Sequence, residues 1–337
     1  MGKKILDYFI KTLNGMAYGL FSTLIIGTII STIASFFHDD FVNPILNDLA
    51  TGLKMLTGVG IGLGIAASLK LDGLKLIGAT VAGGLASYLS GTIEFKIGDP
   101  LVIYFVVIIS VELTNLVLRK KTPVDIIIIP LFISIIASIT TLLINKPVSN
   151  VTTAIGNFIT RTTELHPFVM GIIISVVMGM ALTAPISSAA IAIAINLSGL
   201  AAGAAVVGCS VQMVGFAVMS RKDNNLGTII SIGIGTSMLQ FKNIVKKPII
   251  WLPTIIVSAI LGPLATVVFK VLCNKYGAGM GTSGLVGQIQ TFAEMKNTPM
   301  TWFSIIGLQI IIPMILVYII DVIFRKYHLI ENGDLKV

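Results

Sequence analysis

Long apolar runs follow one another along the chain, and short polar or glycine-rich stretches separate them. A helix needs about 20 mainly apolar residues to cross a hydrocarbon core of about 30 Å, and runs of this kind recur from end to end. The runs predict about ten crossings, at 17–37, 52–69, 73–91, 100–118, 123–144, 167–183, 185–197, 198–219, 248–273 and 301–323. The predicted fold class is therefore all-α, a polytopic membrane protein.

Segment 226–241 is apolar as well, but it is short and broken by glycine. Positive charge flanks it on both sides, at Arg221, Lys222, Lys242, Lys246 and Lys247. Positive charges mark the cytoplasmic ends of membrane segments, so charge at both ends predicts a re-entrant hairpin that enters and leaves on one side. The predicted architecture thus combines transmembrane helices with a re-entrant hairpin and broken helices.

Composition supports this class, because 55% of the residues are hydrophobic, only 11% are charged, and the mean hydropathy is +0.97. Soluble domains carry about 25% charged residues. No polar stretch is long enough to fold separately, so we expect a single membrane domain over 1–337. Within it we expect an amphipathic helix at 1–16 on the cytoplasmic face, a cytoplasmic tail at 324–337, and a helix at 147–166 that lies along the outer interface or is an ordinary linker.

The net charge of +8 is spread over short groups between apolar runs, which is typical of topology signals and does not indicate nucleic-acid binding. With the N-terminus inside, sixteen of the 23 lysines and arginines fall on the inner side. The chain is therefore expected to be a multi-pass protein of the cell membrane with both termini cytoplasmic.

Cys209 and Cys273 lack metal-site spacing, and no catalytic set is visible, so we expect neither a metal nor a cofactor.

Three stretches, at 183–188, 233–240 and 277–288, place glycine, hydroxyls and amides where a membrane protein is normally apolar. Irregular backbone at this depth is tolerated where protein or a water-filled cavity satisfies it, which favours a solute path. Close packing of helices through small residues is the alternative. The candidate solute-binding residues are Ser187, Ser188, Thr236, Ser237, Gln240, Asn243, Thr282, Ser283 and Gln288.

Pro185 is expected to end the sixth span and leave free N–H groups at the start of the next helix, where the two serines either bind solute or cap the helix. The neutral groups of all three stretches suit a polyhydroxylated or zwitterionic solute.

Glu112 lies inside span 100–118 and is the candidate for a coupling proton, with a structural ion pair or hydrogen bond as the alternative. Asp321 is expected to pair with Arg325.

Five segments together carry a family resemblance over nearly the whole chain: NG at 14–15, TAPISSAAI at 183–191, GTSMLQ at 235–240, NI at 243–244 and GTSGLVGQ at 281–288. They resemble the phosphotransferase-system enzyme IIC-like membrane proteins, a family that includes the perfringolysin O regulator proteins of Gram-positive bacteria. The resemblance implies an α-helical, sugar-carrier-like scaffold in the plasma membrane, a homodimer, and a phosphotransfer or regulatory partner protein.

Carriers of this family work with phosphorylating domains that bear histidine or cysteine, and many show a Gly-Ile-Thr-Glu-type loop. No such domain is attached here, and Gly91-Thr92-Ile93-Glu94 is a partial likeness at another place in the chain. We therefore do not expect an enzyme or phosphorylation-coupled uptake. The predicted function is carrier-like transport of a small polar solute, such as a sugar, through a midplane cavity. The alternative is a transporter-derived sensor that regulates toxin gene expression without flux.

Overall fold

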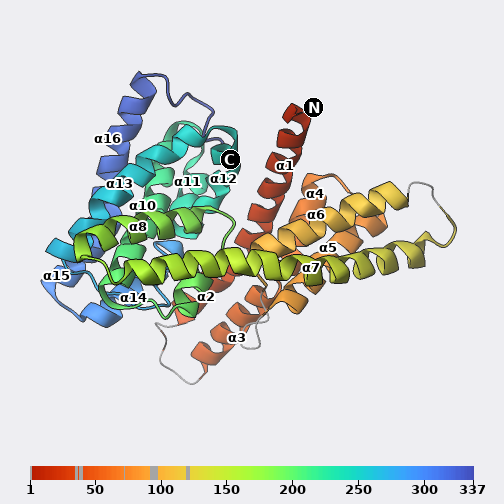
Figure 1. The fold of residues 1–337 in the computed structure, drawn as a ribbon, viewed down its shortest axis with the longest axis horizontal. Coiled ribbons are helices and arrows are strands. Elements are labelled where there is room, and N and C mark those ends of the chain that lie inside the picture. The colour runs from red at the N-terminus through yellow and green to blue at the C-terminus, as the bar shows by residue number, and fades with distance from the viewer. Residues whose placement is uncertain (1, 35–36, 38–40, 72, 92–97, 119–121) are drawn as a thin grey trace. The chain divides into compact units, whose positions relative to one another are not determined.

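The computed structural model describes residues 2–34, 37, 41–71, 73–91, 98–118 and 122–337. These residues form helices and, within the described part of the chain, no named strand, so the fold is all-α as predicted (Figure 1). The chain divides into two compact units, Met1–Val151 and Thr152–Val337. Glu94 of the partial Gly-Ile-Thr-Glu likeness lies outside the described residues, and so do the basic residues 119–121, which belong to the sixteen expected on the inner side.

The helices of unit 1 are α1 (Gly2–Leu20), α2 (Ile26–Ala34), α3 (Val42–Met55), α4 (Thr57–Ser68), α5 (Gly73–Ser90), α6 (Pro100–Val117) and the first part of α7 (Asp125–Thr162). A π-helical turn, Phe21–Ile25, joins α1 to α2, so the predicted amphipathic helix at 1–16 continues into the first span. Glycines bring these helices together: a Cβ on Gly15 would overlap the carbonyl of Gly64, and a Cβ on Gly58 would overlap that of Gly83. Small residues at these crossings let backbones approach closely.

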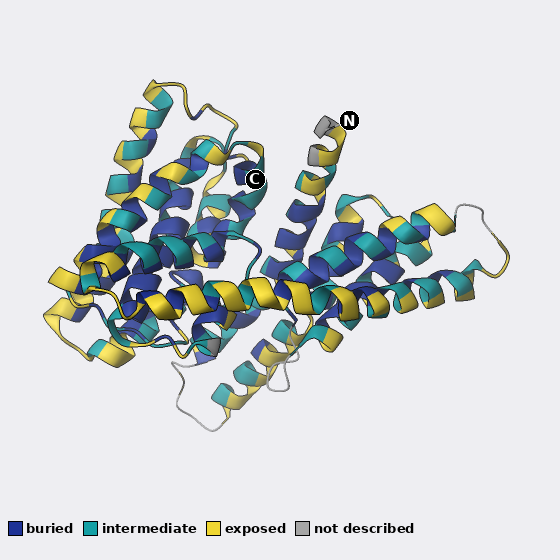
Figure 2. Cartoon of the chain, viewed as in Figure 1, coloured by how far each residue is buried: buried dark blue, intermediate teal, exposed yellow. Residues whose placement is uncertain are grey.

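Helix α7 is continuous over 38 residues, with Pro147 inside it. The segment 147–166 was expected to form a helix of its own, but residues 147–162 extend the helix of span 123–144. At 1.5 Å per residue α7 measures about 57 Å, nearly twice the hydrocarbon thickness. Much of its surface is exposed within the chain (Figure 2), so this helix offers a long apolar face to its surroundings.

The helices of unit 2 are α8 (Pro167–Thr183), α9 (Ser188–Ala194), α10 (Gly199–Met219), α11 (Leu226–Ile230), α12 (Phe241–Lys246), α13 (Leu252–Pro263), α14 (Val286–Met295), α15 (Pro299–Trp302) and α16 (Ile312–Lys326). Helix α10 is the centre of this unit, because it is almost completely buried and packs against α8, α13 and α16 (Figure 2). Helix α8 has the predicted bounds 167–183. Helix α9 contains seven residues, about 10 Å, so the helical part of segment 185–197 is about a third of the hydrocarbon thickness.

Six helical stretches among the described residues are long and apolar enough to cross a membrane: Asp7–Ala34, Pro100–Val117, Asp125–Thr162, Gly199–Lys222, Pro248–Val268 and Pro299–Lys326. A seventh forms if α3 and α4, which are bent by 48° relative to each other, make one broken span. The chain is thus a multi-pass membrane protein with broken helices. The count of about ten crossings stays a prediction.

Candidate functional site

A buried polar network surrounds Gln212, which lies on α10 and is fully buried. Its Oε1 atom accepts hydrogen bonds from Trp251 Nε1 (2.9 Å) and Thr254 Oγ1 (3.0 Å), both near the start of α13. Thr183 Oγ1, at the end of α8, lies 3.3 Å from the same oxygen. The Gln212 Nε2 atom is buried and has no partner among the described residues. The network therefore holds one side of this amide and leaves a donor unused on the other.

The first polar stretch contacts the second at this network. Ser237 is fully buried, and its hydroxyl shares a hydrogen bond of 2.8 Å with Thr183. The preceding residue, Thr236, is extended, and its hydroxyl accepts from Met238 N–H at the break in the hairpin. Together these contacts bring the break after α8 and the break within 226–241 to one place beside α10.

The third polar stretch contacts the second through its hydroxyls. Thr282 Oγ1 donates to the carbonyl of Gly233, and Ser283 Oγ donates to that of Gly235 at 2.8 Å. Both carbonyls belong to the π-helical turn Ser231–Gly235. The helix that begins at Leu226 ends in this turn, so its last carbonyl oxygens have no partner within the helix. The two hydroxyls thus satisfy main-chain groups that the broken helix exposes.

The first and third stretches also meet. Ser188 Oγ donates to Gly279 O at 2.7 Å, whereas Ser187 caps α9 by accepting from Ala190 N–H. Gly281 has a φ of +53° and lies so close to Cys209 on α10 that a Cβ would come within 2.6 Å of its carbonyl carbon. A larger residue fits neither this backbone conformation nor this space. All three stretches therefore contact one another around α10.

A second amide cluster lies where α14 contacts the π-helical stretch Phe303–Ile311. Gln288 Nε2 donates to Gln309 Oε1 at 2.8 Å and lies 3.5 Å from Ser210 Oγ on α10. Gln309 Nε2 in turn donates to Thr291 Oγ1 at 3.1 Å. Gln288 Oε1 is buried without a partner in the described part of the chain. The cluster thus presents an unused acceptor, as Gln212 presents an unused donor.

The remaining two predicted residues, Gln240 and Asn243, bind the C-terminal segment 331–337. Gln240 Nε2 donates to Leu335 O at 2.9 Å, and Asn243 Nδ2 donates both to Gln240 Oε1 at 2.7 Å and to Lys336 O at 3.1 Å. Both residues are buried. Their amides are therefore engaged by main-chain groups, and solute binding by them stays a prediction.

The same C-terminal segment holds the other end of the hairpin. Asp223 accepts from the N–H groups of Gly333 (2.8 Å) and Leu335 (3.1 Å), and Asn224 Nδ2 donates to Leu335 O at 2.7 Å. Since Asn224 and Gln240 bind the same carbonyl oxygen, the two ends of 226–241 lie together. This is the arrangement that a re-entrant hairpin requires.

An ion-pair cluster lies beside this junction. Asp321 is fully buried and pairs with Arg325 at 3.0 Å, as predicted, and with Arg221 at 2.6 Å.

The sequence model of the family described as phosphotransferase system, EIIC matches residues 10–337. The chain belongs to this EIIC family. No curated protein matches the chain. As an EIIC protein it is a membrane transporter component of the sugar phosphotransferase system, the permease part and not the phosphorylating part.

Glu112 of this EIIC protein belongs to unit 1, whereas the other predicted site residues belong to unit 2. Its carboxylate is exposed within the chain and accepts a hydrogen bond of 2.6 Å from the Tyr8 hydroxyl on α1. The structural hydrogen bond that was the alternative for Glu112 is thus present. A role in proton coupling stays a prediction.

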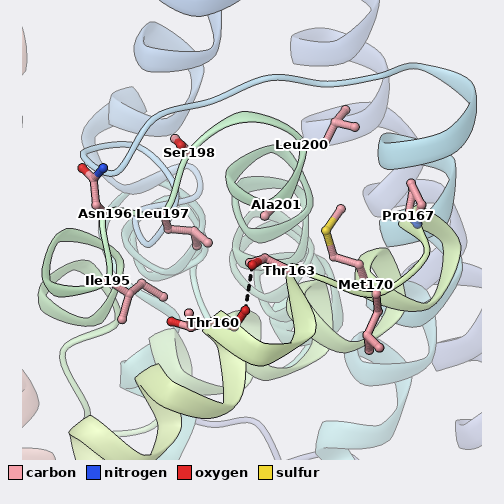
Figure 3. A pocket seen from close by; sticks show the side chains of 11 residues that line it. Thr160, Thr163, Pro167, Met170, Ile195, Asn196, Leu197, Ser198, Leu200 and Ala201 are labelled. Carbon is pink, nitrogen blue, oxygen red and sulfur yellow. Dashed lines mark hydrogen bonds between the residues drawn. The ribbon is translucent and has the colours of Figure 1, made fainter.

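Unit 2 of the EIIC chain also contains a cavity of about 370 Å³ near the start of α10 (Figure 3). Thr160 and Thr163 line it from the end of α7, and Asn196 and Ser198 line it from the connection between α9 and α10. Met170 adds an apolar side chain from α8. The lining combines neutral polar groups with apolar surface, a mixture that suits the hydroxyls and the C–H face of a sugar.

Gln212 and Gln309 are missing from the site that the sequence predicted. Each is an amide inside an otherwise apolar span, and polar residues within membrane spans are costly and commonly functional. An amide inside an apolar span, outside any glycine-rich stretch, is the sequence signal that both residues carry.

Proposed function

We propose that this EIIC-family protein is a permease for a sugar or a similar hydroxylated solute, which binds in unit 2 beside α10. The observation that carries the proposal is that two buried amide atoms of unit 2, Gln212 Nε2 and Gln288 Oε1, have no partner among the described residues. A buried donor or acceptor without a partner costs about 1–3 kcal/mol. A hydroxyl both donates and accepts, so one class of ligand satisfies both atoms.

The predicted site residues fall into two roles in this proposal. Ser237 and Gln288 belong to the amide networks and are the ones that we expect to face solute. Ser188, Thr282 and Ser283 bind main-chain carbonyls and hold the three broken stretches in place around the solute. The arrangement resembles the discontinuous helices that form midplane sites in transporters.

The finer features of the proposal follow from the sequence. We place both termini inside the cell because of the asymmetry of lysine and arginine between the loops. The other components of the phosphotransferase system are the expected partners, and a homodimer is the expected assembly.

A sensor without flux is the second candidate, and one observation favours it. The C-terminal segment is bonded to both ends of the hairpin, through Asp223 and Asn224 at one end and Gln240 and Asn243 at the other. Movement of the hairpin on solute binding would therefore reach this segment, which a regulatory partner could detect. A sensor predicts solute binding without transport.

The experiment is uptake and exchange of radiolabelled sugars in proteoliposomes, combined with binding titrations on the same protein. Gln212→Ala should weaken binding about 2- to 13-fold for each solute bond that Nε2 makes, because each contributes about 0.5–1.5 kcal/mol. Thr254→Val removes a bond within the network but leaves Nε2 in place, so it should lower stability and preserve affinity. Gln290→Ala, a matched truncation outside the network that removes a bond with Asn274, should leave the affinity unchanged. Binding without flux would establish the sensor, and no binding by any sugar would refute both functions.

A further inference from the structure

A separate pocket lies in unit 1, between one face of α1 and the turn that follows α4, and has a volume of about 520 Å³. Lys4, Lys11 and Asn14 line it from α1, at spacings of seven and three residues that place side chains on one face of a helix. Lys70 lines it from the turn, where a φ of +56° reverses the chain after α4. Two lysines of α1 and a third from a distant part of the sequence therefore line one cavity.

The charges of the pocket are unbalanced. Asp7 is the carboxylate in its lining, and Glu112 is held nearby by the Tyr8 hydroxyl. Even with both acids counted, three lysines against two carboxylates leave a net positive charge. Among the described residues, none of the ion pairs includes Lys4, Lys11 or Lys70. Like charges around a partly closed cavity repel one another, and an anion between them removes that repulsion.

The position of the pocket along the helix narrows the class of anion. The apolar span Asp7–Ala34 begins at this level of α1, so the pocket lies at the end of a membrane-crossing helix and not in its middle. Lipid phosphates occupy that depth in a bilayer, and dissolved anions can reach it from the water. The lining is rich in lysine, amide and hydroxyl groups, which suits a head group and not an acyl chain.

We propose that this pocket binds a phosphate group, carried either by an anionic lipid head group or by phosphate in solution. Lysine binds phosphate as a mobile point charge, and basic pockets between transmembrane helices are known to take phosphate-bearing head groups. Asn14 also lines the pocket and adds a neutral amide group to it. The site is independent of the solute network in unit 2, so it does not rest on the proposed transport function.

The test uses the full chain in nanodiscs of phosphatidylcholine alone or of phosphatidylcholine with phosphatidylglycerol, and measures the thermal unfolding midpoint in each. Inorganic phosphate is titrated into the phosphatidylcholine nanodiscs. Each lysine beside a phosphate is expected to contribute about fivefold in affinity, so the triple variant Lys4→Gln, Lys11→Gln, Lys70→Gln should lose about 100-fold. The same three positions changed to Arg should keep binding, which separates lost charge from lost folding.

The matched control changes charge equally at three lysines outside the pocket, with Lys222→Gln, Lys242→Gln and Lys246→Gln in one chain. Stabilisation by phosphatidylglycerol that the pocket variant loses and the control keeps identifies a lipid head group. Stabilisation by inorganic phosphate with the same pattern identifies a soluble ligand. The proposal is overturned if neither probe stabilises the protein, or if the control loses as much affinity as the pocket variant.

Discussion

Gln240→Ala separates a structural role of the hairpin from a solute-binding role. The substitution removes two hydrogen bonds, one from Gln240 to Leu335 O (2.9 Å) and one from Asn243 to Gln240 (2.7 Å). Neither partner is left without a hydrogen bond, because Leu335 O also accepts from Asn224 and the Asn243 amide also donates to Lys336 O. At about 0.5–1.5 kcal/mol for each bond, the free energy of unfolding should fall by about 1–3 kcal/mol.

A double-mutant cycle isolates the contact with the C-terminal segment. In a chain that lacks residues 335–337, Gln240→Ala can cost only the bond with Asn243, so the coupling energy should be about 0.5–1.5 kcal/mol. The assay is denaturant unfolding of the four detergent-solubilised chains. Gln290→Ala, which affects a bond with Asn274 elsewhere in unit 2, should show no coupling to the same truncation.

A solute-binding role of Gln240 predicts a different result from the structural role. If Gln240 binds solute and does not support the fold, its truncation should weaken solute affinity about 2- to 13-fold per bond and leave the stability of the solute-free protein unchanged. That result, or a coupling energy of zero in the cycle, would refute the structural role argued from the contacts. Lost stability with unchanged affinity would remove Gln240 from the solute site.

Two further predictions concern the same face of unit 2. Burial raises the pKa of Asp334, but hydrogen bonds from Lys247 and the Glu331 N–H, with nearby positive charge, outweigh it and hold the pKa below its ordinary value. The Lys247–Asp334 pair should therefore stabilise the fold above the unfolded-state pKa of about 3.9 and lose this effect as the pH falls further. The measurement is the difference in unfolding free energy between the native chain and Asp334→Asn as a function of pH. This difference should shrink toward zero in acid, and a difference that grows there would contradict the pairing. Lys222→Cys and Lys246→Cys, in a background without the two native cysteines, should be labelled from the same side of the membrane, and labelling from opposite sides would mean that 226–241 crosses it.

Local features of the sequence predicted the parts of the fold that local forces determine. Helix α8 ends at Thr183 as expected, since Pro185 cannot donate to a continuing helix. The same rule gives the wrong result at Pro147, where α7 continues without a break. Neighbouring groups and local adjustments satisfy the freed carbonyl in membrane helices, and no sequence pattern reveals them.

The candidate site was predictable in its composition and not in its pairings. Glycine and hydroxyl residues marked three stretches that indeed contact one another, because such residues are needed where backbone is irregular in a membrane. The partners of Gln212 lie 29 to 42 residues away in sequence, and one of the two partners of Gln240 lies 95 residues away. Such distant pairs depend on how helices pack, which hydropathy does not specify.

The bonds that hold segment 331–337 involve mostly its main chain: the N–H groups of Gly333, Leu335 and Val337 and the carbonyls of Leu335 and Lys336. The backbone conformation of this segment therefore decides its binding more than most of its side chains do. A proline at position 335, however, would delete the N–H that donates to Asp223, so this substitution should detach the segment from that end of the hairpin.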